Sequence, residues 1–302
     1  MKYVHIVDDF PASEDGEGQV LIVCLDGFLD AGRSASLLTT HLADEAPRPI
    51  VASFDIDAFH DYRARRPGVT FTENHYHDYD APRIVVRQML DANDVPYLMM
   101  TGPEPDMRWE AFAEGVAEVV TRLGVRLVLT LDSVPMAAPH TRPLMVTRHA
   151  NMPDRRSDVS HWSGSLRVPA SVQALLAIRL GERDLPLQGF VLHVPHYRAQ
   201  FDFNDGALAL AREVTTELGL VFNTNAIRLE AEADDERYRE YVAGHPELAS
   251  LVTGLEEQYD RFQFAEASGL NLLPGEELPD GEQLGAEFQR FLAGLDERGP
   301  DN

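Results

Sequence analysis

Carboxylates, histidines and arginines of this sequence stand where apolar runs end, as polar residues do at the ends of buried strands. Glu104 and Asp106 follow one apolar run, His193 and His196 close another, and Asp132 follows a third. A histidine can act as a general base, a carboxylate can orient it, and an arginine can bind an oxyanion. The same residue types also cap turns and helices. The pattern is therefore typical of a ligand-binding cleft and equally of a structural edge.

The residues that we assign to this cleft all lie in or beside a turn next to an apolar run. They are Asp26, Gly27, Asp30, Gly32, Asp55, Asp57, Tyr62, Arg66, Gly102, Glu104, Asp106, Arg108, His140, Arg142, His193 and His196. Their spacing assigns no catalytic role to any of them. Ser133 and Ser165 are candidate nucleophiles only in the sense that any loop serine is one.

Motifs of well-known enzymes and metal sites are missing from the sequence. It contains no Gly-x-Ser-x-Gly elbow, no P-loop, no His-Glu-x-x-His pair and no cysteine box. Asp55 and Asp57 suit a metal or a turn cap, and capping is favoured because no matching ligand cluster accompanies them. His75 and His77 share a face if their segment is extended, but a zinc site needs more ligands. We therefore expect no metal and no cofactor, and we favour a protein that is not an enzyme.

The segment 96–112 is the one around which the other elements are arranged. Residues 97–100 are apolar and lie between Pro96 and Gly102, which is the pattern of a short buried strand. Asp106 can cap a helix that begins near Met107. The sequence thus predicts a tight acidic turn at the carboxyl end of a core strand, where open α/β sheets form their ligand crevices.

A second strand, turn and helix pattern precedes this segment. Residues 20–25 are continuously apolar, as in a strand covered on both faces, and a turn with Gly27 and Gly32 leads into a helical pattern. The glycines permit close backbone approach, and the helix start offers N–H groups to an anion. The glycine spacing is not that of the dinucleotide fingerprint.

Three arginines form a basic group in this acidic chain, namely Arg63, Arg65 and Arg66. If the group is partly buried, we expect it to pair with carboxylates, and a phosphate or carboxylate ligand is the alternative. The candidate partner carboxylates are Asp55, Asp57 and Glu104.

The remaining apolar runs predict an α/β domain over residues 1–222 and an acidic helical extension over residues 223–302. Strands are expected at 4–7, 50–54, 69–71, 83–89, 126–131, 144–147 and 189–194, and a helix at 207–218. Residues 155–164 have the composition of an exposed loop, and residues 269–281 that of a flexible linker. Residues 230–302 hold 19 acidic and 5 basic residues. Apolar stripes at 248–262 and 284–295 can pack on the body or form a subunit interface.

The composition and net charge of the chain disfavour several classes of partner. The 302 residues suffice for one large core or two smaller ones, and the net charge of -24 disfavours nucleic acid and anionic membranes as partners. Cys24, the sole cysteine, lies in an apolar run, so a buried thiol is expected. No apolar run approaches the roughly 18 residues of a membrane span, and the N-terminus lacks a secretion signal. We therefore expect a cytoplasmic protein.

Five segments in this order resemble motifs of the PAC2 family, the proteasome assembly chaperone 2-like proteins. They are LDGFLDAG at 25–32, FDID and the following residues to Pro67, GPEPD with Arg108 and Trp109, PHTRP at 139–143 and VPHY at 194–197. Residues 241–260 resemble the helical extension of the actinobacterial branch of the family. Phe28 stands where the family has a tryptophan, and residues 163–165 replace a Gly-Pro-Thr-Gly-like turn.

The resemblance implies a three-layer α/β/α sandwich, phosphorylase/hydrolase-like, with a helical C-terminal extension. It implies a protein-binding, assembly-chaperone-like homo-oligomer, for example a trimer, with proteasome-related or other proteins as partners. A small-ligand binder, or a hydrolase- or phosphorylase-like enzyme that uses the strand-end cleft, is one alternative, and a purely structural oligomer is another. The last residues lack the hydrophobic-Tyr-x ending of many proteasome-binding factors, so docking through the tail is not expected.

Overall fold

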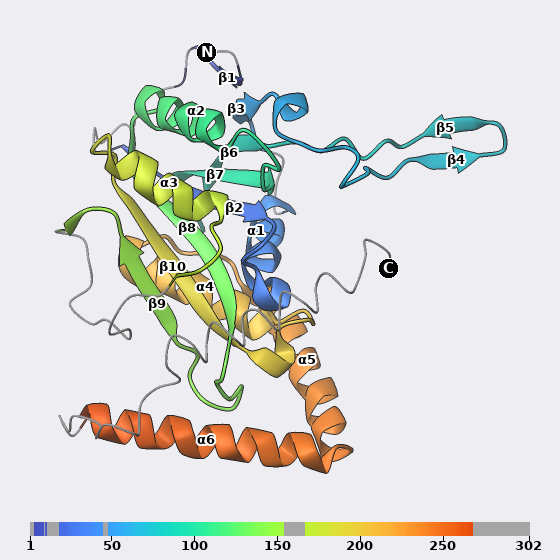
Figure 1. The fold of residues 1–302 in the computed structure, drawn as a ribbon, viewed down its shortest axis with the longest axis vertical. Coiled ribbons are helices and arrows are strands. Elements are labelled where there is room, and N and C mark those ends of the chain that lie inside the picture. Colours follow the sequence, from blue (N-terminus) through green and yellow to red (C-terminus); the bar gives the residue numbers. More distant parts are fainter. Residues whose placement is uncertain (1–2, 9, 11–17, 45–47, 154–166, 268–302) are drawn as a thin grey trace.

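The chain folds around one eight-stranded sheet, as the computed structural model shows for residues 3–8, 10, 18–44, 48–153 and 167–267 (Figure 1). The strands lie in the order β1-β3-β6-β7-β2-β8-β10-β9. Their bounds are β1 Val4–Ile6, β2 Gln19–Asp26, β3 Ile50–Phe54, β6 Val85–Leu90, β7 Pro96–Pro103, β8 Val125–Met136, β9 Val146–Ala150 and β10 Leu187–Pro195. Strands β7, β2, β8 and β10 are parallel neighbours. The antiparallel pairings of β6 with β7 and with β3 make β3 run in the same direction as β7.

Strand β2 lies at the centre of the sheet and is buried on both faces, as its continuous apolar run predicts. Leu21 and Val23 belong to the core on one face of the sheet, and Ile22 and Cys24 belong to the core on the other face. This alternation follows the two-residue period of a strand. Strands with both faces covered are typical of parallel sheets that carry a helix layer on each side.

Helices supply those two layers (Figure 1). Helices α2 Trp109–Arg122 and α3 Val172–Gly181 pack on one face, and α1 Ser34–Asp44 and α4 Asn204–Leu218 pack on the other. The apolar side chains of α2 that face the sheet are spaced three and four residues apart, as in an amphipathic helix, with Phe112, Val116, Val119 and Val120 all buried. The arrangement confirms the predicted three-layer α/β/α sandwich.

Two parts of the chain lie outside the three layers (Figure 1). Strands β4 Thr70–Thr72 and β5 His75–His77 form a separate two-stranded hairpin that projects from the body. At the other end of the molecule, α5 Asn225–Ala243 begins against α4, and α6 Pro246–Ala267 follows it. The predicted division of the chain at residue 222 falls between α4 and α5 and stays a prediction.

Several elements differ from their predicted extents. Strand β8 continues to Met136, five residues beyond the predicted end, because β10 pairs with it residue for residue as far as Pro195. The strand predicted at 69–71 belongs to the hairpin instead of the main sheet. The loop predicted at 155–164, the linker at 269–281 and the apolar stripe at 284–295 lie outside the described residues.

Candidate functional site

The predicted cleft residues do not form a single site, and only some of them belong to the two groups described below. Strands β2, β3, β7, β8 and β10 run in the same direction, so the segments that follow them begin at the same edge. Strands β8 and β10 pair as far as Met136 and Pro195, whereas β2 pairs with β8 only up to Val23 and Thr130. Along the strand direction, the segments after β8 and β10 therefore begin farther from the middle of the sheet than the segments after β2, β3 and β7.

The first group, which we call the edge network, joins the segments after β2, β3 and β7. The Glu104 N–H donates to the Asp26 carbonyl oxygen at 2.8 Å. Arg65 donates from Nη2 to the Glu104 carbonyl oxygen at 2.6 Å and pairs with Asp106 Oδ1 at 2.7 Å. Gly27 lies directly against Glu104, because a Cβ on Gly27 would stand 2.7 Å from Glu104 Oε2. These contacts hold the predicted acidic turn in one position.

The Glu104 carboxylate extends the edge network to the helix layer. Its Oε1 accepts a hydrogen bond from the Val172 N–H at 2.7 Å, in the first turn of α3. A carboxylate at a helix start is stabilised by the unpaired N–H groups and by the helix dipole. Glu104 thus serves as a structural link between β7 and α3.

The prediction that Asp106 caps α2 is wrong. Helix α2 begins at Trp109, and Arg108 at its N-cap position has a left-handed backbone with φ 57° and no capping side chain. Asp106 instead accepts the Asp61 N–H at 2.6 Å and pairs with Arg65. Arg108 donates to the Tyr3 hydroxyl at 2.8 Å. The cap prediction failed because a partner distant in sequence took the carboxylate.

Asp30 occupies the start of the helix that the sequence offered to an anion. Its carboxylate accepts the Ala35 N–H at 2.9 Å, the Ser36 N–H at 3.2 Å and the Ser133 hydroxyl at 3.1 Å. Gly32 has φ +65° and donates its N–H to the Ala199 carbonyl oxygen at 2.7 Å. Protein groups therefore satisfy the donors at this turn.

Asp132 lies behind the edge network and inside β8, not after the strand as the sequence suggested. It is 4% exposed, and its Oδ1 accepts a hydrogen bond from Gln173 Nε2. Burial raises the pKa of Asp132 to about 7, and the nearby Asp30 and Glu104 carboxylates add to the rise. Its place after residues 126–131 made Asp132 one of the strand-end polar residues in the sequence, although it was not assigned to the cleft.

The second group, which we call the aromatic cluster, contains His140, Tyr197, Arg198 and Tyr238. The Tyr197 hydroxyl lies 2.9 Å from both the backbone N and Nδ1 of His140, and the Tyr197 and Tyr238 rings stack at 6.1 Å. The Arg198 guanidinium lies 4.0 Å from the centre of the Tyr238 ring, although Arg198 is only 3% exposed. Burial and the charge of Arg198 lower the pKa of His140. The cluster fastens α5 to the segment after β10.

The other cleft residues after β8 and β10 have separate partners. His193 lies inside β10, is buried, and contacts the Thr147 hydroxyl through Nε2 at 2.8 Å. His196 is exposed and lies 3.4 Å from the Met136 carbonyl oxygen through Nδ1. Arg142 pairs with Asp260 of α6. The three side chains do not form one site.

The predicted cleft residues after β3 contact one another more than they contact the edge network. The Tyr62 hydroxyl donates to Asp57 at 2.6 Å, and this bond raises the pKa of Tyr62 to about 12. Asp55 stands at the N-cap position of the short 3-10 helix Ile56–Ala58, but its side chain makes no capping bond. Arg66 is exposed. The arginine that joins the network is Arg65, and its carboxylate partner is Asp106, which was not among the predicted partners.

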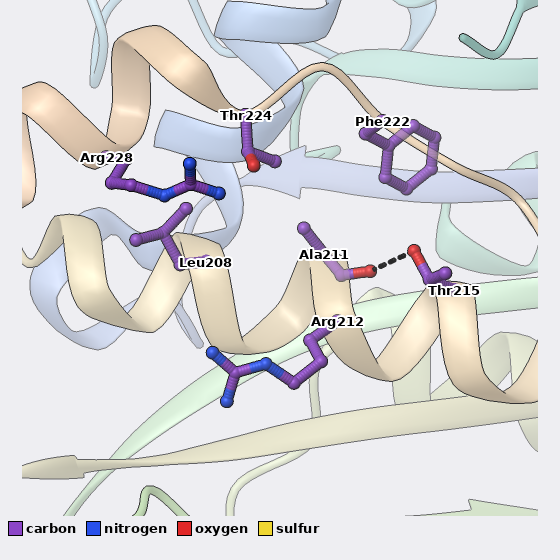
Figure 2. A pocket seen from close by; sticks show the side chains of 7 residues that line it. All are labelled: Leu208, Ala211, Arg212, Thr215, Phe222, Thr224 and Arg228. Atoms are coloured by element: carbon purple, nitrogen blue, oxygen red, sulfur yellow. Dashed lines mark hydrogen bonds between the residues drawn. The ribbon is translucent and has the colours of Figure 1, made fainter.

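Within the described residues, no three histidine, cysteine or acidic side chains are grouped as metal ligands would be. The His75 and His77 rings do share a face of the hairpin, with centroids 5.3 Å apart. None of the described helices is long and apolar enough to cross a membrane. The pocket in Figure 2 lies between α4 and α5, and no residue of the predicted cleft lines it.

Comparisons with known proteins give the family. A model of the PAC2 family matches residues 24–242. The structure of a Mycobacterium tuberculosis protein of unknown function is 36% identical, with a TM-score of 0.83 over 97% of this chain and 96% of that chain. A Corynebacterium glutamicum protein of unknown function is 31% identical, with a TM-score of 0.80 over 86% of this chain and 97% of that chain. A Mycobacterium tuberculosis proteasome-assembly chaperone homologue is 25% identical, with a TM-score of 0.70 over 78% of this chain and 100% of that chain. Functionally curated proteins gave no match. This chain belongs to the PAC2 family.

Proposed function

We propose that this chain is a protein-binding, assembly-chaperone-like protein that works as a homo-oligomer in the cytoplasm. Family membership supports a chaperone-like role, because a relative at 25% identity is a proteasome-assembly chaperone homologue. Proteasome-related proteins are therefore the first partners to test. Fold alone does not decide function, so the proposal depends on a surface of this chain.

The observation that carries the proposal is the aromatic surface of the projecting hairpin. Phe71 is 57% exposed, Tyr76 is 72% exposed and Tyr79 is 55% exposed. Phe71 and Tyr76 are cross-strand partners whose ring centroids lie 4.8 Å apart. The hairpin extends away from the body (Figure 1). Exposed aromatic groups of this kind mark protein-binding surfaces, and a two-stranded hairpin on its own is marginally stable in water. Contact with a second protein would stabilise it.

The edge network supports a binding role over catalysis at the sheet edge. The Glu104 carboxylate is bound to the start of α3, and Asp30 is bound to the start of α1. Asp106 is paired with Arg65. A general acid or base must reach the proton that it transfers, whereas these carboxylates are engaged with protein groups.

The first experiment measures the oligomeric state of the full chain by sedimentation equilibrium. We expect the wild type to associate, and a Phe71→Ser, Tyr76→Ser double variant to associate much more weakly. An Ile178→Ser variant is the control, because Ile178 is also 57% exposed but lies on α3. Because like charges repel at a net charge of -24, association should strengthen as salt is added. A wild type that stays monomeric, or a double variant that associates like the control, contradicts the proposal.

The second experiment tests the partner. Purified proteasome core subunits of the same organism are mixed with the full chain and separated by size. We expect the wild type to co-migrate with unassembled subunits and to speed their assembly, and we expect the hairpin double variant to do neither. Equal assembly rates with and without the chain would exclude the proteasome as the partner. They would not affect the self-association measured in the first experiment.

Asp132 favours a second candidate function, a small-ligand binder or a hydrolase- or phosphorylase-like enzyme that uses the sheet edge. A buried carboxyl with a pKa of about 7 is a recognised feature of functional sites. Thermal shifts with nucleosides, inorganic phosphate and short peptides test this function. A ligand that stabilises the wild type but not a Glu104→Ala variant would favour it, and equal shifts in both proteins would exclude it.

A further inference from the structure

A pocket of about 160 Å³ lies between α4 and the start of α5 (Figure 2). Its lining residues are Leu208, Ala211, Arg212, Thr215, Phe222, Thr224 and Arg228. They come from α4, from the segment that follows it and from the first turn of α5. None of them belongs to the edge network or the aromatic cluster, so any binding here is independent of the proposed function.

The pocket combines an apolar wall with two positive charges. Leu208, Ala211 and Phe222 supply the apolar wall. Arg212 comes from α4 and Arg228 from α5, and Figure 2 shows their guanidinium groups on either side of the Leu208 side chain. A guanidinium binds carboxylate or phosphate oxygens through two parallel hydrogen bonds. A ligand that suits both surfaces has an anionic head and an apolar body.

The two arginines are exposed on the surface of a chain with 50 acidic and 26 basic residues. Among the described residues, neither Arg212 nor Arg228 takes part in an ion pair. The nearby carboxylates of α4 are engaged elsewhere, because Glu213 and Glu217 both pair with Arg148 of β9. Two unpaired guanidinium groups on one pocket make a local positive field within an acidic protein.

The start of α5 adds to this field. Thr224 precedes the helix, its side chain makes no capping bond, and the first turn contains no acidic residue. Thr224 also lines the pocket. The Asn225 N–H donates to Asn223 Oδ1 at 3.4 Å, so what this helix start offers an anion is chiefly the positive end of the helix dipole.

The acidic charge of the whole chain opposes anion binding but acts over a longer range. At physiological ionic strength, exposed charges are screened beyond about 8 Å. The guanidinium groups of Arg212 and Arg228 would contact the anion directly, and no carboxylate is among the residues that line the pocket. We therefore expect the local attraction to outweigh the distant repulsion.

We infer that this pocket binds a small organic oxyanion, with its carboxylate or phosphate head between Arg212 and Arg228 and its apolar body against Leu208, Ala211 and Phe222. The volume of about 160 Å³ limits the apolar body to a single ring or a short alkyl group. Because Arg212 lies on α4 and Arg228 on α5, a bound anion also ties the two helices together. Binding then restrains the position at which α5 leaves the body.

Isothermal titration of the full chain tests the inference with three probes: phenyl phosphate, benzoate and inorganic phosphate. We expect a ring-bearing anion to bind with a Kd below about 1 mM and inorganic phosphate to bind at least about tenfold more weakly. Comparison of phenyl phosphate with benzoate decides whether the head is a phosphate or a carboxylate. Arg212→Gln and Arg228→Gln should each weaken binding by about tenfold or more, since each removes a charge-assisted hydrogen bond.

Arg239→Gln is the matched control, because Arg239 lies on α5, is exposed, and pairs with Glu236 away from the pocket. Its affinity should equal that of the wild type. The inference is overturned if neither ring-bearing probe binds, if the Arg212 and Arg228 variants bind like the control, or if inorganic phosphate binds as tightly as phenyl phosphate.

Discussion

Arg142 and Asp260 form a two-point ion pair between residues 118 positions apart, with Nε to Oδ1 at 2.8 Å and Nη2 to Oδ2 at 2.7 Å. The pair joins the segment after β8 to α6. Glu256 of α6 also approaches Arg142, at 3.4 Å, and the Tyr259 hydroxyl donates to the Pro143 carbonyl oxygen at 3.2 Å. Hydrogen bonding to Arg142 lowers the pKa of Asp260. These polar contacts hold α6 against the body.

Arg142→Gln should loosen α6 without unfolding the α/β body. The variant loses the two-point pair, while the sheet and its two cores are untouched. We expect several-fold faster amide hydrogen exchange in residues 246–261 and almost no change in Tm, measured by mass spectrometry and calorimetry. Arg239→Gln, which removes a pair within α5, serves as the control. Equal exchange rates in the two variants would mean that Arg142 does not position α6.

Asp132→Asn should alter how stability depends on pH. The folded-state pKa of Asp132 is about 7, above its ordinary value of 3.8, so the folded state holds the proton more tightly than the unfolded state. The stabilisation from this proton is complete below about pH 4 and is lost as the pH rises through about 7. Asparagine cannot titrate, and its amide oxygen can still accept the bond from Gln173.

The measurement for Asp132→Asn is urea unfolding of both proteins at about pH 5 and about pH 8. Relative to the wild type, the variant should gain unfolding free energy between the two values, by at most about 3 kcal/mol. Other carboxylates titrate in both proteins, so only the difference between the two curves is informative. Parallel curves would show that Asp132 is ionised in the folded protein near pH 5.

Gly102→Ala should destabilise the fold strongly. Gly102 has φ +139°, and a Cβ there would collide with the Arg83 carbonyl oxygen and lie 2.8 Å from the Ile84 Cα. Backbone atoms of the segment that leads into β6 cannot move aside cheaply, so we expect a loss of roughly 3 kcal/mol or more in unfolding free energy. Gly124→Ala is the control, because Gly124 has φ +64° and open space around it, and it should lose only about 1–2 kcal/mol. Urea unfolding of both variants compares the losses, and equal losses would contradict the steric argument.

Cys24 should be unreactive in the folded protein. Its side chain is 3% exposed, and burial together with the nearby Asp30 carboxylate raises the pKa of the thiol. Since the thiolate is the nucleophile, both access and reactivity are low. A thiol-specific reagent should label the native chain far more slowly than the urea-unfolded chain. Labelling of the native chain at the unfolded rate would show that β2 opens to solvent.

The local features of this protein followed from the sequence by itself. The apolar run 20–25 predicted the central strand, the glycine turn at Gly27 and Gly32 predicted the following helix, and the spacing of apolar residues predicted α4. The spacing of apolar residues in a strand or helix is a local property, so the residues of each element are enough to predict it. The three-layer fold and the family were predictable from these elements and from the five motifs.

Only the tertiary structure decided which polar residues meet. It paired Arg65 with the carboxylate of Asp106, whereas Arg65 reaches Glu104 only at its carbonyl oxygen, and it placed Asp132 inside β8 with its raised pKa. It also gave the predicted cleft residues separate partners and brought Arg212 and Arg228 to one pocket. Such pairings depend on strand order and on helix packing between segments far apart in the chain. The residue pattern within a single segment does not reveal these pairings, because the two partners meet only after the sheet has formed.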